Sequence, residues 1–249
     1  MSLLRTFVSY ILTTVYLVVF GLLVLLFHPL QVIAHSLFGT KPHKSIVDYL
    51  CYLLIRSLLL LGVDYEIAGK IDVPADRPVI ILSNHQSMFD IPAIIWVLQK
   101  LHPRFVSKKE LGKGFPSISY NLRKSQAALI DRKDRAQSIV EIERLGRLIQ
   151  KEKSAACIFP EGTRSKTGKL RRFNSAGVDA MLKTAPDAVI LPFVIDGHAK
   201  LQAKGFFPLN CCMKLHYTIL PTIDPKGRST ADVISEVRMQ MAGVLGQKQ

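Results

Sequence analysis

An apolar stretch near the start of the sequence constrains this chain most, because it carries no charge from Phe7 to Phe27. Roughly 20 consecutive apolar residues are enough for a helix to cross the hydrocarbon core of a bilayer. The stretch is too long for the apolar region of a usual secretory signal peptide, and His28 and Pro29 follow it in place of a small-residue cleavage site. The sequence therefore predicts a membrane-embedded helix in this region.

A second apolar stretch, residues 46–61, is shorter and contains the charged residues Asp48 and Arg56. At helical spacing these two charges fall on a different face from Leu53. This pattern predicts a helix that lies in the membrane interface or packs on the first helix. Residues 1–62 are thus expected to form a pair of membrane-anchoring helices. The arrangement is either a single span with the domain held at one face of the membrane or a helical hairpin that dips into one leaflet.

Positive charges around the first stretch predict its orientation. Lys41 and Lys44 follow the stretch, and Arg5 precedes it. The positive-inside rule places the end with more lysine and arginine in the cytoplasm, although Arg5 reduces the difference. We expect a protein of the inner (cytoplasmic) membrane, with the rest of the chain on the cytoplasmic side and a hinge at residues 41–44.

The charge of the chain narrows the class of partner. The formal net charge is +14 at pH 7, and most of it lies beyond the two apolar stretches. A basic surface favours nucleic acids, anionic membrane lipids or phosphorylated substrates. No helix-turn-helix pattern, zinc-finger spacing or aromatic-rich RNA-binding signature occurs in the sequence. We therefore predict lipid and phosphorylated partners and no nucleic acid.

The 4 cysteines do not mark a metal site or a disulfide framework. Cys211 and Cys212 are adjacent, whereas Cys51 and Cys157 lie in apolar runs. Their spacing does not match a zinc site. We predict core thiols in a reducing compartment and no bound metal.

From residue 63 onward, short β-rich runs alternate with helical patterns. The pattern in residues 134–150 is the clearest, because its apolar residues recur at helical intervals. This alternation predicts a single α/β domain over residues 63–249, with a central, mostly parallel or mixed sheet flanked by helices. The expected strands are 63–67, 79–83, 104–107, 126–130, 155–159, 188–195 and 214–220, and the expected helices are 91–101, 134–150, 173–184 and 231–245.

A polar segment, Ser83 to Asp90, follows the predicted strand 79–83. Ligands bind at the carboxyl ends of strands in open α/β sheets. His85 and Asp90 can meet there, and a carboxylate on one imidazole nitrogen leaves the other nitrogen free to act as a base. A structural role fits as well, because Ser87-x-x-Asp90 before an apolar run is a capping-box pattern.

A second polar segment follows the predicted strand 155–159. It reads PEGTRS over residues 160–165, so a glycine turn comes just before a guanidinium. The planar fork of Arg164 suits a phosphate, although a surface turn with a Glu161–Arg164 pair explains the same pattern. The next basic residues are predicted either to contact anionic lipid headgroups or to form a solvated face. They are Lys166, Lys169, Arg171 and Arg172.

Two further predicted strands end in basic residues, with Lys108 and Lys109 after one and Arg132 after the other. Together with Arg164, these charges are predicted to converge on one anionic ligand at one edge of the sheet. The sequence contains no nucleophile elbow, no phosphate-binding P-loop and no zinc-binding histidine pair. A His–Asp base without a protein nucleophile indicates activation of a hydroxyl of the substrate, with no metal or bound cofactor.

These segments resemble the motifs of the glycerolipid acyltransferase family. Residues 85–90 have the H-x-x-x-x-D form of that family, and residues 159–165 reproduce its FPEGTRS block in the same order along the chain. Residues 131–132 and 189–193 are similar to two further blocks. The resemblance covers roughly residues 41–220 and is greatest to the bacterial 1-acylglycerol-3-phosphate (lysophosphatidate) acyltransferases within the family.

The resemblance implies a mechanism and a set of site residues. Asp90 would orient His85, and His85 would deprotonate the sn-2 hydroxyl of lysophosphatidate. The oxygen would attack the thioester of acyl-CoA or acyl-carrier protein, giving phosphatidate without an acyl-enzyme intermediate. Arg164, Lys108 and Arg132 would hold the phosphate. Glu161, Gly162 and Thr163 would shape the phosphate pocket, and Leu191, Pro192 and Phe193 would line the acyl region or belong to the core.

Other functions fit parts of this pattern. Glycerol 3-phosphate, another lysophospholipid or a lyso-aminolipid could serve as the acceptor in the same chemistry. A function from another class is a non-catalytic, membrane-tethered module that binds anionic lipid through residues 166–172. That function leaves His85 and Asp90 without a role, so acyl transfer to lysophosphatidate is the leading hypothesis.

Overall fold

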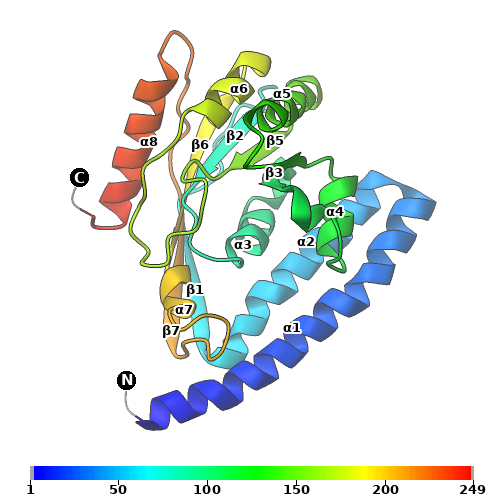
Figure 1. Cartoon of the computed structure of the whole chain (residues 1–249), viewed down its shortest axis with the longest axis vertical. Coiled ribbons are helices and arrows are strands. Elements are labelled where there is room, and N and C mark those ends of the chain that lie inside the picture. Colours follow the sequence, from blue (N-terminus) through cyan, green and yellow to red (C-terminus); the bar gives the residue numbers. More distant parts are fainter. Residues whose placement is uncertain (1–2, 248–249) are drawn as a thin grey trace.

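The computed structural model describes residues 3–247, with side chains described from residue 6. Its centre is a seven-stranded sheet in the order β1-β7-β6-β2-β5-β3-β4 (Figure 1). β6 and β7 are antiparallel, and the other neighbouring strands are parallel, so the sheet is mixed. The strands are β1 (Val63–Ala68), β2 (Val79–Ser83), β3 (Pro103–Lys108), β4 (Ala128–Ile130), β5 (Ala155–Ile158), β6 (Val189–Asp196) and β7 (Met213–Ile219).

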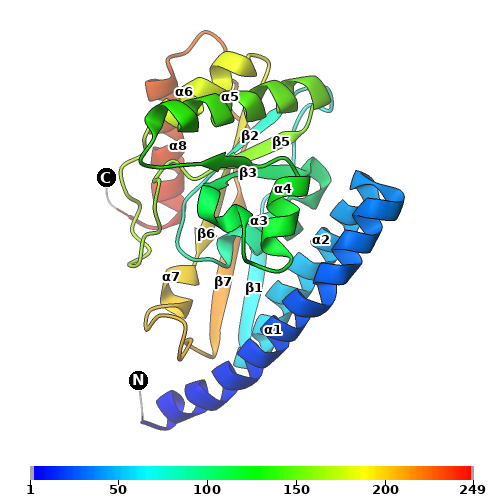
Figure 2. The ribbon, with the colours of Figure 1, turned by 45° about the vertical axis from the view of Figure 1, so that its right-hand side comes forward.

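Helices cover both faces of the sheet (Figure 2). Side chains of α5, α6 and α8 form one core with the sheet, and side chains of α2 and α3 form the other. The predicted α/β fold with flanking helices is therefore confirmed. The helices are α1 (Leu3–Phe38), α2 (Thr40–Arg56), α3 (Asp90–Val97), α4 (Ile118–Lys124), α5 (Arg135–Glu152), α6 (Ala176–Thr184), α7 (His198–Leu201) and α8 (Thr230–Val244), with 3-10 turns η1 (Ser57–Leu61), η2 (Gln99–Leu101) and η3 (Lys109–Gly112).

Strand β2 lies in the middle of the sheet and supports both cores. Val79 and Ile81 pack in the core that contains α2 and α3, whereas Ile80 and Leu82 pack in the core that contains α5, α6 and α8. Successive side chains of a strand point to opposite faces, so a strand buried on both faces needs a continuous apolar run. That run ends at Ser83, and the polar segment begins at the carboxyl edge of the sheet.

Helices α1 and α2 lie side by side and meet at Gly39, whose φ of 82° favours glycine (Figure 1). α1 has 36 residues and is long and apolar enough to cross a membrane over Thr6–Phe38. Most of its apolar surface is not covered by the rest of the protein. The large apolar side chains exposed on α1 include Phe7, Ile11, Val18, Leu22, Leu25, Leu26, Ile33 and Leu37.

Helix α2 joins α1 to the sheet, because it packs on α3 as well as on α1. Its side chains Val47, Cys51 and Ile55 belong to the core beneath α3. The predicted hinge at residues 41–44 is wrong, because this segment lies inside α2. An ion pair between Lys44 and Asp48, one helical turn apart, supports the helix at this point.

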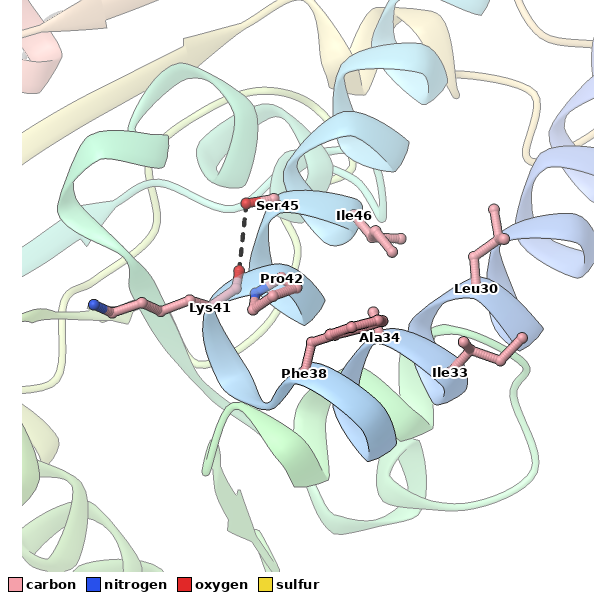
Figure 3. Close-up of a pocket in the computed structure, with 8 residues that line it drawn as sticks. All are labelled: Leu30, Ile33, Ala34, Phe38, Lys41, Pro42, Ser45 and Ile46. Carbon is pink, nitrogen blue, oxygen red and sulfur yellow. Dashed lines mark hydrogen bonds between the residues drawn. The ribbon is translucent and has the colours of Figure 1, made fainter.

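An open hollow of about 600 Å³ lies between the adjoining ends of α1 and α2 (Figure 3). Its lining is almost wholly apolar, with Lys41 and Ser45 as the polar residues. Lys41 points away from the hollow in Figure 3, and its carbonyl accepts a hydrogen bond from Ser45 Oγ. The lining residues come from the helix pair alone and not from the polar segment after β2. They are Leu30, Ile33, Ala34, Phe38, Lys41, Pro42, Ser45 and Ile46.

Three details differ from the sequence-based expectation. Helices α4 and α7 were not expected, because segments of 7 and 4 residues are too short to show a helical period. Cys212 is exposed, whereas the other cysteines are buried, so the expectation of a core thiol is wrong for this residue. It follows Cys211 with a φ of 54°, in a turn that leads into β7.

A close approach of α5 and α6 generates a stability prediction. A methyl group at Gly146 would lie 2.1 Å from Thr184 Oγ1 and 3.0 Å from the carbonyl oxygen of Met181. Gly146→Ala is expected to lower the free energy of unfolding by about 1–3 kcal/mol, because the helices must separate. Thermal unfolding of the detergent-solubilised protein measures the effect as a lower Tm.

The matched control is Gly243→Ala in α8, where no heavy atom lies within 4 Å of the added methyl group. This change is expected to be neutral or to stabilise the protein by up to about 1 kcal/mol, because alanine restricts the unfolded chain. Equal Tm values for the two variants would contradict the close contact at Gly146.

Candidate active site

Four neighbouring parallel strands carry most of the predicted site residues at one edge of the sheet. β2, β5, β3 and β4 are consecutive in the sheet. The polar segment of residues 83–90 follows β2, and the turn of residues 159–165 follows β5. β3 ends at Lys108, and Arg132 lies just after β4. The carboxyl ends of parallel neighbours meet at the same edge, so the strands bring the base and the cations to one side of the sheet.

His85 and Asp90 form the hydrogen bond that the sequence predicted. His85 Nδ1 lies 2.7 Å from Asp90 Oδ2. Asp90 is fully buried as the first residue of α3, and the side chain of His85 is 11% exposed. Within residues 6–247, the other ring nitrogen of His85, Nε2, has no hydrogen-bond partner. The imidazole is therefore oriented through Nδ1 and has a free nitrogen at the surface.

The carboxylate of Asp90 also accepts hydrogen bonds from the backbone. Its Oδ2 lies 2.6 Å from the amide nitrogen of Gln86 and 2.9 Å from that of Ser87. The capping box is only half formed, because Ser87 Oγ accepts from the amide of Phe89 and donates to Gln202. Asp90 therefore supports the turn and orients His85 at the same time.

The charge of Asp90 is strongly stabilised despite its burial. Burial raises the pKa of Asp90, but hydrogen bonds from His198 and His85 outweigh burial and hold this pKa well below its ordinary value. The carboxylate is thus ionised at neutral pH.

The turn after β5 is attached directly to His85. The ring of Phe159 stacks on the His85 ring, with centroids 4.1 Å apart and planes inclined by 18°. The amide of His85 donates to Glu161 Oε1 at 2.9 Å, and the amide of Ser165 donates to the carbonyl of His85 at 2.7 Å. The two sequence motifs therefore form one structural unit.

Glu161 is a buried bridge and not half of a surface pair with Arg164. Its second carboxylate oxygen, Oε2, accepts from the amide of Arg171 at 3.1 Å. Burial raises the pKa of Glu161, and the hydrogen bonds from the amides of His85 and Arg171 oppose this effect only in part. The role of Glu161 in the structure is to hold the long segment after β5 against the turn that carries His85.

Gly162 and Thr163 follow Glu161 at the surface. Gly162 has a φ of 69°, and its amide closes the turn by donating to the carbonyl of Phe159. A side chain at this position would meet no neighbour within 4 Å, so the backbone conformation is what requires glycine. The turn leaves Arg164 exposed beside Thr163.

The predicted phosphate-binding cations lie exposed at the ends of their strands. Lys108 in β3 lies opposite Ile130 in β4. Arg132 follows Ile130 by two residues, just beyond the end of β4. Loss of surrounding water lowers the pKa of Arg132, and so does the positive charge of Arg164, so the two guanidinium groups lie in the same region. Within the described side chains, Lys108, Arg132 and Arg164 form no ion pair, whereas Lys109 pairs with Asp131 at 2.5 Å.

The residues assigned to lipid contacts fall into two places. Leu191, Pro192 and Phe193 are buried in the middle of β6, which places them in the packed core, and contact with an acyl chain stays a prediction. The four basic residues beyond Arg164 are exposed on the segment after β5 and form no ion pair with any side chain of residues 6–247. They are Lys166, Lys169, Arg171 and Arg172.

Buried amide side chains attach the turn after β2 to the end of β6. Asn84 exchanges two hydrogen bonds of 2.8 Å with the backbone of Ile195. Gln86 donates to the carbonyl of Ile195 and accepts from the amide of Ala199. These contacts bring the segment after β6 against Asp90.

Sequence reasoning missed a second histidine at the site. His198 is fully buried, and its Nδ1 lies 2.5 Å from Asp90 Oδ1. Its Nε2 lies 2.9 Å from the hydroxyl of Tyr217 in β7. His198 belongs to no motif, and the only signal in the sequence was its place just after a predicted strand. Within the described residues, no group of three or more metal-ligating side chains could hold a metal ion, and the absence of a bound cofactor stays a prediction.

Comparison with known proteins gives related sequences along most of the chain. The 1-acyl-sn-glycerol-3-phosphate acyltransferase of Saccharomyces cerevisiae is 26% identical over 215 residues, an alignment that covers 84% of this chain and 69% of that protein. The 1-acyl-sn-glycerol-3-phosphate acyltransferase alpha of Mus musculus is 24% identical over 185 residues, covering 73% of this chain and 62% of that protein. The chain thus spans about two thirds of the length of these two relatives.

The fold is similar to a solved structure over nearly its whole length. The crystal structure of the 1-acyl-sn-glycerophosphate (LPA) acyltransferase PlsC from Thermotoga maritima superposes with a TM-score of 0.78 at 24% identity, covering 98% of this chain and 99% of that chain. At this identity the similarity shows a common fold.

The family of the chain follows from a direct match in sequence. The Acyltransferase family matches residues 64–196, which is more than half of the chain. The matched region runs from β1 to the end of β6 and contains both the His85–Asp90 pair and the turn that carries Arg164. This match confirms the resemblance seen in the two motifs, and the chain belongs to the acyltransferase family.

Proposed function

We propose that this acyltransferase transfers a fatty acyl group from a thioester donor to the sn-2 hydroxyl of 1-acylglycerol 3-phosphate (lysophosphatidate), giving phosphatidate. The observation that carries the proposal is the 2.7 Å bond between His85 and Asp90 on the same sheet edge as the unpaired Arg164. An oriented base beside a cationic site suits an acceptor that carries both a hydroxyl and a phosphate. The names of the relatives support this acceptor.

The site geometry supports direct transfer between the two substrates. His85 Nε2 takes the proton of the acceptor hydroxyl as its oxygen attacks the thioester carbonyl carbon. The new carbon–oxygen bond replaces the carbon–sulfur bond, and the protonated imidazole returns its proton to the departing thiolate. Asp90 stabilises the positive charge on His85 during the transfer. Acyl-CoA and acyl-carrier protein both supply the required thioester.

The phosphate of the acceptor is assigned to Arg164, with Arg132 and Lys108 beside it. Two guanidinium groups near each other repel unless an anion lies between them, and the lowered pKa of Arg132 reflects part of that repulsion. Glu161 cannot neutralise Arg164, because its carboxylate is engaged with backbone amides. The positive charge at this edge is therefore available for a phosphate monoester.

The site is proposed to work at a membrane surface. The exposed apolar side chains of α1 provide the anchor, and the acceptor lipid is itself a membrane component. We place the sheet domain on the cytoplasmic face, where the acyl donors are found and where Lys41 and Lys44 favour it. The exposed cations of residues 166–172 would then contact anionic headgroups.

The defining experiment is acyl transfer by the detergent-purified protein. Labelled acyl-CoA and labelled acyl-carrier protein are each offered with lysophosphatidate, glycerol 3-phosphate or other lysophospholipids. Saturable formation of phosphatidate from lysophosphatidate, well above transfer to the other acceptors, is the expected result. Preferred transfer to another acceptor would replace lysophosphatidate as the substrate.

The base is tested by His85→Ala and Asp90→Asn. General-base catalysis contributes about 10²–10⁴-fold to the rate, so His85→Ala is expected to reduce kcat by that factor. Asp90→Asn should reduce it as well, because the imidazole loses both its orientation and its counter-charge. His216→Ala, on the exposed side of β7, is the matched control and should keep the parent rate. Equal turnover by folded His85→Ala and the parent enzyme would remove His85 from the mechanism.

The phosphate site is tested by Arg164→Gln. Hydrogen bonds to charged groups contribute about 1.5–3 kcal/mol, so KM for lysophosphatidate should rise about tenfold or more, with a smaller change in kcat. The control is Arg147→Gln, which removes an exposed arginine that lies 3.6 Å from Glu143 in α5. A KM unchanged in Arg164→Gln would place the phosphate elsewhere.

Headgroup contact is tested by replacing all four basic residues beyond Arg164 with glutamine. Each lysine or arginine near an anionic surface contributes about 1 kcal/mol to binding. The variant should therefore bind vesicles that contain phosphatidylglycerol more weakly than the parent does, in a salt-dependent way. Binding to purely zwitterionic vesicles, which depends on α1, should not change. Equal weakening on both kinds of vesicle would contradict a headgroup role. The four residues are Lys166, Lys169, Arg171 and Arg172.

A further inference from the structure

A buried chain of polar side chains runs from the proposed base, after β2, to β7, two strands away in the sheet. It passes from His85 to Asp90, from Asp90 to His198 and from His198 to Tyr217. Asp90, His198 and Tyr217 have no exposed surface. Buried polar groups must be paired, and a fully paired chain holds its members in one arrangement.

The segment between β6 and α7 places His198 in this chain. Gly197 has a φ of 95°, and a side chain there would lie 2.9 Å from Leu215 Cδ2 and 3.2 Å from the carbonyl oxygen of Lys214. Only glycine suits both the conformation and the space. The turn therefore passes close to β7 and directs the next residue, His198, between Asp90 and Tyr217.

The hydrogen bonds define where the protons lie. Burial raises the pKa of Tyr217 above its ordinary value, and the charge of Asp90 adds to the effect, so the hydroxyl keeps its proton. Among the described residues its hydrogen-bond partner is Nε2 of His198, and the buried hydroxyl proton is paired there only if it is donated to an unprotonated Nε2. The single N–H of the neutral ring is on Nδ1 and points to Asp90 Oδ1, whereas His85 and two backbone amides donate to Oδ2.

We propose that His198, held in this tautomer by Tyr217, is a positioning residue for acyl transfer, because it fixes the Asp90 carboxylate and weakens its pull on the His85 proton. By holding Oδ1, the N–H of His198 keeps Oδ2 turned toward His85. By donating to Oδ1, it also shares the negative charge that attracts the His85 proton. This inference rests on the proposed role of His85 as the base.

The surrounding groups leave few other sources of a pH effect. Cys157 in β5 faces Asp90, and burial raises the pKa of its thiol well above the ordinary value. Tyr16 in α1 and Tyr65 in β1 lie behind Tyr217. Glu161 faces the turn that carries His85. The groups in direct contact with Asp90 are therefore the two histidines and the amides of Gln86 and Ser87, with Glu161 as the nearby acid.

Two substitutions of His198 separate hydrogen bonding from packing. His198→Leu removes the donor, whereas His198→Asn keeps an N–H at the position of Nδ1 and loses only the link to Tyr217. In His198→Leu, we expect the midpoint of the acid limb of the kcat/KM–pH profile to rise by about one pH unit. At pH values below this midpoint, kcat/KM should be about tenfold lower than in the parent enzyme. His198→Asn should keep the limb of the parent enzyme.

Three outcomes would overturn the inference. They are an unshifted limb in folded His198→Leu, an equal shift in both variants, or a downward shift. Glu161→Gln is measured in parallel, and a limb that moves only in this variant would assign the titration to Glu161.

A second measurement does not depend on either variant folding. Nitrogen-15 NMR of the histidine-labelled parent protein should show His198 as the neutral ring protonated on Nδ1. A doubly protonated ring, or the Nε2–H tautomer, would refute the hydrogen-bond chain. The proposed function fails separately, if the parent transfers no acyl group to lysophosphatidate or if folded His85→Ala retains full activity.

Discussion

The buried charge of Asp90 is the constraint on which the site depends. An ionised carboxylate inside a protein is costly unless hydrogen-bond donors surround it. The turn after β2 supplies three of these donors, and the segment after β6 supplies the fourth through His198. Satisfying one carboxylate therefore joins two strand ends whose residues are 108 positions apart in the sequence. The orientation of His85 is a consequence of the same arrangement.

Glu161 fixes the backbone on the cationic side of the site through hydrogen bonds, as Asp90 fixes the base. Its two oxygens accept from the amides of His85 and Arg171, so it joins the turn after β2 to the segment that follows the turn after β5. Because these bonds occupy the carboxylate, Arg164 has no acidic partner next to it in sequence. Glu161 thus leaves Arg164 free for an anionic ligand. In the same motif, Phe159 stacks on the imidazole of His85, and the amide of Ser165 donates to the carbonyl of His85.

The sheet was predictable because burial on both faces leaves a clear trace in the sequence. The run Val79–Ser83 is apolar at every position but the last, and β5 and β6 show the same continuity, so their place in the centre follows from composition alone. The amphipathic pattern of α5 was equally clear. The short helices α4 and α7 and the exposure of Cys212 depend on contacts with distant segments, so local sequence did not reveal them.

By itself, the sequence determined the α/β class, the long apolar helix, the two motifs and the pairing of His85 with Asp90. These features are local, because they depend on periodicity or on residues within one turn of each other. Tertiary structure decided that α2 belongs to the core, that Glu161 is buried against the backbone and that Leu191 to Phe193 lie inside the sheet. It also decided the contact of His198 and Tyr217 with Asp90. That contact arises from the pairing of β6 with β7 and from the space that Gly197 leaves, and neither has a signature in the order of residues around it.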